Sequence, residues 1–111
     1  MTLELPARLV DPNEHPRKTA QRELLEETGL PTRQIFDLGC FATDTGRLTN
    51  RTHSYFVEAG DQIPGFDREP RIEVLFATIE DLVKLVINQA FDVQIQLGTL
   101  FQAIVMGHIA L

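Results

Sequence analysis

The sequence predicts an α/β or α+β domain. Segments with helix start and stop signals alternate with segments rich in β-branched and aromatic residues, which is the pattern of a sheet covered by helices. A length of 111 residues with 43% apolar content is enough for one small core. Residues 1–111 are therefore expected to form a single domain.

The first helix is expected over Pro16 to Thr28. Residues 2–10 have strand-like character near Leu3 and Leu5, which a proline interrupts. Pro16 suits the first turn of a helix because the N–H that it lacks would have no partner there. Gly29 suits the position just past a helix, where φ is often positive.

The rest of the chain is expected to complete the sheet and add two helices. Residues 61–71 contain proline, glycine and charged residues and predict a loop. A helix opens at Ile79, and a last helix, about Val93 to Met106, is apolar nearly all round, which predicts heavy burial. Apolar, alternating or β-branched content predicts three strands: Gln34–Thr43, Arg51–Ala59 and Ile72–Thr78.

Composition argues against several classes of protein. A net charge of −6 disfavours a nucleic-acid-binding surface. No apolar run approaches the roughly 18 residues of a membrane span, and no signal-peptide pattern is visible, so we expect a cytoplasmic protein without membrane contact. The lone Cys40 cannot form an internal disulfide, and its apolar neighbours predict a buried, inert thiol.

Three glutamates of the first helix share one face. The spacings from Glu23 to Glu26 and Glu27 bring their side chains together, and each such like-charge pair costs about 0.2–0.5 kcal/mol. The last turn of a helix also prefers cations over carboxylates. Arg22 can offset part of this repulsion, and a hard divalent cation, Mg²⁺ or Mn²⁺, would offset the rest. The alternative interpretation is a solvated acidic surface, which is common on short helices.

The segment Arg22–Leu30, RELLEETGL, resembles the end of the Nudix box, G-x5-E-x7-R-E-U-x-E-E-x-G-U, where U is an apolar aliphatic residue. Glu14 also fits the motif, while Arg8 replaces its opening glycine. The preceding ELPAR resembles the E-L-P-A-G lead-in of the ADP-ribose pyrophosphatase branch. The resemblance implies a Nudix-like fold, with a mixed sheet held between helices. This fold would be N-terminally shortened here, because strands normally precede the box. Either the chain is a shortened homologue, or a second copy supplies the missing edge, which predicts a homodimer.

The resemblance also implies roles for single residues. Metal ligands would be Glu23, Glu26, Glu27 and the backbone carbonyl of Ala7, and Arg22 would orient the glutamates. Catalysis would involve Glu26, Glu27 and Arg22. The part of Glu14 would be subsidiary.

A general base often lies on a later loop in this branch. Glu69 is the first candidate and Glu73 the next, and the alternative for Glu69 is a solvated loop carboxylate.

The resemblance points to metal-dependent hydrolysis of the diphosphate linkage of a nucleoside diphosphate derivative. ADP-ribose or a nucleotide sugar is the first guess, although Thr45 stands where the ADP-ribose branch commonly has proline. One alternative is a catalytically degenerate homologue that binds a nucleotide or a protein, since the side chain of Arg8 adds bulk and restricts φ where the box has glycine. Another is an interaction module built on the apolar helices, with the acidic face merely solvated.

Overall fold

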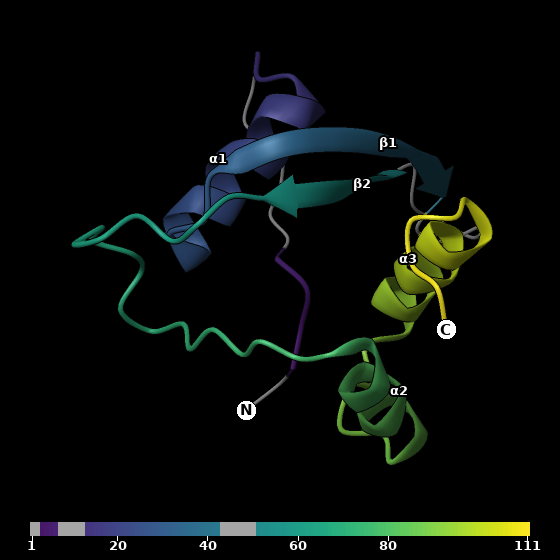
Figure 1. Cartoon of the computed structure of the whole chain (residues 1–111). Coiled ribbons are helices and arrows are strands. Elements are labelled where there is room, and N and C mark those ends of the chain that lie inside the picture. Colours follow the sequence, from purple (N-terminus) through teal and green to yellow (C-terminus); the bar gives the residue numbers. More distant parts are fainter. Residues whose placement is uncertain (1–2, 7–12, 43–50) are drawn as a thin grey trace. The chain divides into compact units, whose positions relative to one another are not determined.

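A computed structural model describes residues 3–6, 13–42 and 51–111 of the chain. Within them lie three helices and two strands, shown in Figure 1: α1 (Pro16–Thr28), β1 (Thr32–Ala42), β2 (Arg51–Ala59), α2 (Ile79–Ile87) and α3 (Gln94–Val105). The strands pair as a two-stranded sheet and run in opposite directions (Figure 1). The α+β class expected from the sequence is confirmed.

The chain divides into two compact units. One unit contains Pro6–Asp37 and Tyr55–Leu75, and therefore α1 with residues 32–37 of β1 and 55–59 of β2. The other contains Met1–Leu5, Leu38–Ser54 and Phe76–Leu111, and therefore α2 and α3 with the remaining described parts of the strands.

The ends of α1 follow the local signals in the sequence. His15 is the N-cap, and its Nδ1 accepts a hydrogen bond of 3.1 Å from the backbone N–H of Arg17. Pro16 occupies the first turn. Gly29 ends the helix with φ of 74°, and its N–H donates to the carbonyl of Leu25 over 2.8 Å. The bounds predicted for this helix are confirmed.

The loop after β2 covers the carboxyl end of α1. The last carbonyls of a helix have no partner within it and need one from elsewhere. The side-chain amide of Gln62 donates to the carbonyl of Thr28 over 2.8 Å, and the backbone N–H of Glu69 donates to that of Glu26 over 3.0 Å. Ile63 N–H donates to the carbonyl of Gly29 over 3.0 Å. Capping of this helix therefore fixes the course of the loop.

A second set of contacts holds the unit that contains α3. The Gln96 side chain accepts from the N–H of Leu5 over 2.6 Å and donates to its carbonyl over 3.3 Å, so it binds the backbone of the N-terminal segment as a strand neighbour would. Ser54 and Thr99 hydroxyls lie 3.4 Å apart. The buried apolar side chains among the described residues are Leu38, Phe91 and Ala103.

Three expectations from the sequence are wrong. The strand predicted over Ile72–Thr78 does not form, because its β-branched content needs a partner strand and no described segment pairs with it. The Cys40 thiol is exposed rather than buried, with Sγ 3.8 Å from His53 Nε2.

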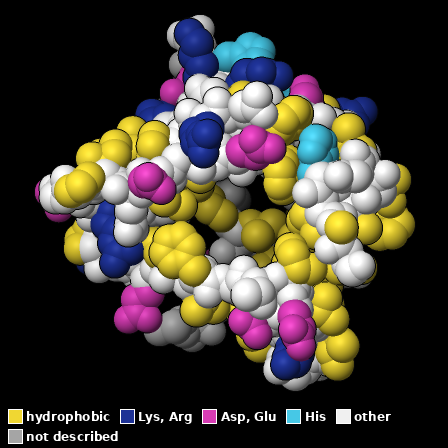
Figure 2. Space-filling model, in the orientation of Figure 1, with side chains coloured by type: hydrophobic (Ala, Val, Ile, Leu, Met, Phe, Trp, Pro, Cys, Tyr) yellow, Lys and Arg dark blue, Asp and Glu magenta, His cyan; other side chains and the backbone are white. Residues whose placement is uncertain are grey.

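The heavy burial predicted for the last helix is the third. Only Ala103 of α3 is buried, while Phe101 and Val105 are 65% and 62% exposed. Apolar side chains accordingly appear on the surface over α2 and α3 in Figure 2. Their burial would need a covering segment, and the described residues do not supply one. No helix in the described parts combines the length and the apolar composition that crossing a bilayer requires.

Replacing Gly29 with alanine should lower the free energy of unfolding by about 1 kcal/mol, because an L-residue resists the left-handed conformation. The added Cβ would lie 3.5 Å from Gln62 Cγ, an ordinary contact, so the cost is conformational rather than steric. Gly98→Ala is the matched control: the glycine lies inside α3 with open space around it, and alanine should stabilise by about 0.5–1 kcal/mol. Urea denaturation measures both, and equal effects would contradict the role given to Gly29.

Candidate functional site

The acidic face of α1 is largely buried. Glu23 and Glu27 are 6% and 7% exposed, whereas the side chain of Glu26, on the same helix, is 51% exposed. A carboxylate removed from water costs free energy unless a positive charge or hydrogen-bond donors replace the water. The alternative of a merely solvated face is therefore wrong for Glu23 and Glu27.

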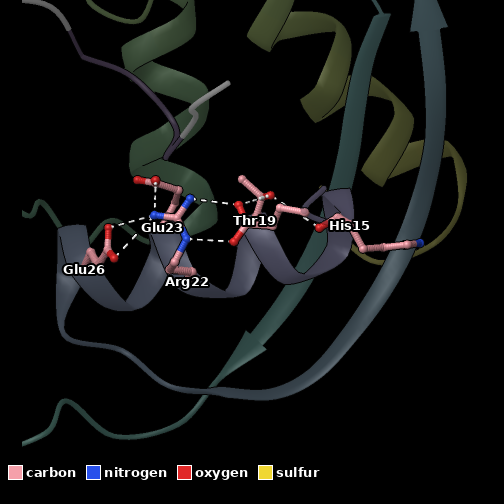
Figure 3. Close-up of polar contacts among 6 residues, drawn as sticks. His15, Thr19, Arg22, Glu23 and Glu26 are labelled. Carbon is pink, nitrogen blue, oxygen red and sulfur yellow. Dashed lines mark hydrogen bonds and ion pairs between the residues drawn. The ribbon is translucent and has the colours of Figure 1, made fainter. Parts of the chain in front are cut away.

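The guanidinium of Arg22 supplies that positive charge to three carboxylates (Figure 3). Its Nε and Nη2 donate to the two oxygens of Glu14 over 3.0 and 2.9 Å, a bidentate pair. Its Nη1 donates to Glu23 Oε1 over 2.8 Å and to Glu26 Oε2 over 3.1 Å. The hydrogen bond with Glu14, aided by the one with Glu26, raises the pKa of Arg22 above its ordinary value, so the guanidinium stays charged.

Local structure explains this convergence. Arg22 and Glu26 are four residues apart on α1, so they face each other across one helical turn. Glu14 lies two residues before the helix begins, where a carboxylate also meets the positive end of the helix dipole. The structure thus places the guanidinium of Arg22 against Glu23 and Glu26, and its orienting role stays a prediction.

The loop places Glu69 at the last turn of α1. Its backbone N–H donates to the carbonyl of Glu26 over 3.0 Å, and the residue is half-buried. Glu73, the other candidate for a base, is exposed. Of the two, Glu69 is the one that a backbone hydrogen bond ties to the glutamate helix.

One contributor was not anticipated from the sequence. Thr19 is buried on α1, and its hydroxyl donates to Glu14 Oε1 over 2.7 Å. Its position three residues before Arg22 puts both side chains on one helical face, which is the signal that could have identified it.

The carboxylates of the site supply the type of oxygen ligand that a hard divalent cation takes. Oxygens of Glu14, Glu23 and Glu26 already surround one positive group, the guanidinium, at 2.8–3.1 Å, and carboxylate oxygens are what Mg²⁺ and Mn²⁺ prefer. In the described parts of the chain, no group of three or more His, Cys, Asp or Glu side chains is arranged to hold a metal ion. Ala7, Arg8 and Thr45 lie outside the described residues.

Comparison with known proteins agrees with the motif. The family model for the NUDIX domain matches residues 2–95. The chain is 32% identical over 87 residues to the ADP-ribose pyrophosphatase of Bacillus subtilis (strain 168). It is 30% identical over 87 residues to the methanol dehydrogenase activator of Bacillus methanolicus. Each alignment covers 76% of this chain and 47% of the relative, so the chain spans about half the length of these curated relatives.

Substituting Arg22 with methionine should lower the melting temperature by about 5 °C or more, because the carboxylate of the buried Glu23 loses the guanidinium that it contacts. Arg17→Met is the control, since Arg17 is exposed in the first turn of the same helix and its loss should change the melting temperature little. Differential scanning calorimetry of both variants measures this. Equal melting temperatures for the two would contradict a stabilising role for Arg22.

Proposed function

Because the chain belongs to the Nudix family, we propose that it hydrolyses the diphosphate linkage of a nucleoside diphosphate derivative with the help of a divalent cation. ADP-ribose or a nucleotide sugar is the proposed substrate class, which the similarity to an ADP-ribose pyrophosphatase supports. Mg²⁺ is the proposed cation, with Mn²⁺ as a substitute.

The observation that carries the proposal is the contact of Arg22 with two carboxylates of α1, Glu23 and Glu26, together with the buried Glu27 on the same helix. Glu23, Glu26 and Glu27 would hold the cation, together with the backbone carbonyl of Ala7. Such a cation would offset the charge of the diphosphate and lower the pKa of the attacking water. The hydrogen bonds from Arg22 Nη1 to Glu23 and Glu26 restrict the orientations of these two side chains, which supports a role for them as cation ligands.

Glu69 is the proposed general base. Its carboxylate would accept the proton of the water as the water oxygen attacks phosphorus and the bridging P–O bond breaks, giving two phosphate-bearing fragments. The hydrogen bond between Glu69 N–H and the Glu26 carbonyl supports this role, because it ties the base to the helix that carries the cation ligands.

A second candidate function is a catalytically degenerate homologue that binds a nucleotide or a protein. Two observations favour it. Arg22 already hydrogen-bonds to Glu23 and Glu26, and a cation would have to compete with it for their oxygens. One relative is named as the activator of a dehydrogenase.

The single domain, the homodimer and the cytoplasmic location stay predictions. The absence of nucleic-acid and membrane partners also stays a prediction. The net charge of −6 argues against a nucleic-acid partner and does not bear on the membrane.

Incubating the protein with ADP-ribose, nucleotide sugars and nucleoside triphosphates plus Mg²⁺ should give turnover that Glu26→Gln or Glu27→Gln lowers by about 100-fold or more, because each removes a charged cation ligand. Glu80→Gln is the control: its side chain is 82% exposed on α2 and should not affect turnover. Phosphate-bearing products are measured by chromatography. Metal-dependent nucleotide binding without turnover would instead support the degenerate homologue. The absence of both turnover and binding would contradict both functions.

Removing the carboxylate of Glu69 should lower kcat by about 10²–10⁴-fold in Glu69→Gln, since proton transfer to a positioned base contributes on that scale. The affinity for Mn²⁺ should stay the same, because Glu69 is not a proposed ligand. Glu73→Gln, at an exposed position of the same segment, is the control and should keep the kcat of the unmodified protein. If kcat falls in Glu73→Gln and not in Glu69→Gln, the general base is Glu73 rather than Glu69.

A further inference from the structure

The hydroxyl of Thr19 donates a hydrogen bond to the carboxylate of Glu14. Thr19 is 4% exposed, and its Oγ1 lies 2.7 Å from Glu14 Oε1 and 3.3 Å from the carbonyl oxygen of His15. A hydroxyl has one proton to donate, and the shorter contact, to a charged acceptor, is the stronger of the two. The donor therefore serves Glu14 rather than the helix backbone.

Glu14 is held at both of its oxygens. Oε1 accepts from Thr19 Oγ1 and from Arg22 Nη2, and Oε2 accepts from Arg22 Nε. The residue lies before the start of α1, so the helical hydrogen bonds do not fix its backbone. Thr19 gives the Glu14 side chain a second attachment to α1, beside that of Arg22.

The orientation of Glu14 in turn sets the orientation of the guanidinium. The guanidinium is planar, so placing Nε and Nη2 on one carboxylate determines where Nη1 points. Nη1 is the nitrogen that reaches Glu23 and Glu26. The three side chains thus form a chain of contacts that starts from a buried hydroxyl and ends at two proposed cation ligands.

We propose that Thr19 is a positioning residue, which fixes Glu14 and through it the guanidinium of Arg22. Its value for cation binding rests on the proposed function, in which Glu23 and Glu26 are ligands. A cation competes with Nη1 for the oxygens of these two glutamates. The contacts of Arg22 with Glu14 do not depend on those oxygens, so they keep the guanidinium in place when the carboxylates of Glu23 and Glu26 turn from Nη1 to the cation.

A metal-free measurement tests the link from Thr19 to Arg22. Solvent exchange of the Arg22 Nε–H proton, followed by NMR, should be about tenfold faster in Thr19→Val, which keeps the shape but removes the donor. Thr19→Ser keeps a hydroxyl and should restore slow exchange. Thr28→Val is the matched control, because Thr28 is another buried threonine of α1, whose hydroxyl donates to the Leu24 carbonyl rather than to a carboxylate. Should Thr19→Val not fold, Thr19→Ala removes the same hydroxyl donor and should also speed exchange.

The affinity for Mn²⁺, measured by electron paramagnetic resonance of the free ion, tests the consequence. Thr19→Val should bind Mn²⁺ about tenfold more weakly, the scale expected for partners of metal ligands, and Thr19→Ser should bind it as the unmodified protein does. Unchanged Nε–H exchange in Thr19→Val, failure of serine to restore it, an equal effect of Thr28→Val, or unchanged Mn²⁺ affinity would overturn the proposal. If the unmodified protein does not bind Mn²⁺, the proposed function fails, and the exchange measurement still decides whether Thr19 positions Arg22.

Discussion

The guanidinium of Arg22 is the group on which the described part of the site depends. Two glutamates of α1, Glu23 and Glu27, are buried, and a buried carboxylate is tolerated only where a charge or donors replace water. Arg22 contacts Glu14, Glu23 and Glu26 at once, so a single positive charge faces three negative ones. The imbalance that limits the stability of this face is also what would attract a cation to it. Stability and proposed chemistry thus have one electrostatic origin.

The end of α1 and the placement of Glu69 follow from one structural event. Gly29 turns the chain out of the helix, which leaves the last carbonyls in need of donors. Gln62 and Glu69 supply two of these donors from the loop after β2. The loop therefore lies against α1 because the helix must be capped there. The same contact places Glu69, the candidate base, at the last turn of α1.

The sequence predicts well where local chemistry decides the structure. Pro16 and Gly29 fix the bounds of α1 through missing or unusual backbone features, which depend on no distant partner. The alternating segment Arg51–Ala59 forms β2 with the predicted bounds. For the candidate site, i to i+4 spacing was enough to bring Arg22 to Glu26.

Prediction failed where a neighbour decides the outcome. Residues 72–78 have the composition of a strand, but a strand forms only against another strand, and none of the described ones pairs with it. Phe101 and Val105 are exposed on α3 for a related reason, because apolar character favours burial without specifying what covers the helix. Thr19 was predictable only in part. The helical spacing shows which face of α1 it lies on, but only the distances in the structure show that its hydroxyl donates to the Glu14 carboxylate rather than to the His15 carbonyl.

The contacts of Arg22 divide into two kinds, and this division bears on both proposed functions. Nε and Nη2 form a closed bidentate pair with Glu14, supported by the buried hydroxyl of Thr19. Nη1 lies on Glu23 and on the half-exposed Glu26, whose oxygens a cation would take. If a cation replaces only the contacts of Nη1 with Glu23 and Glu26, Arg22 remains beside the cation ligands and the site suits catalysis. If Arg22 keeps Nη1 on both glutamates, a bound cation lacks oxygens of two proposed ligands, which disfavours turnover and favours a binding protein. The strength of the Nη1 contacts relative to a divalent cation is therefore the physical quantity that separates the hydrolase from its degenerate counterpart.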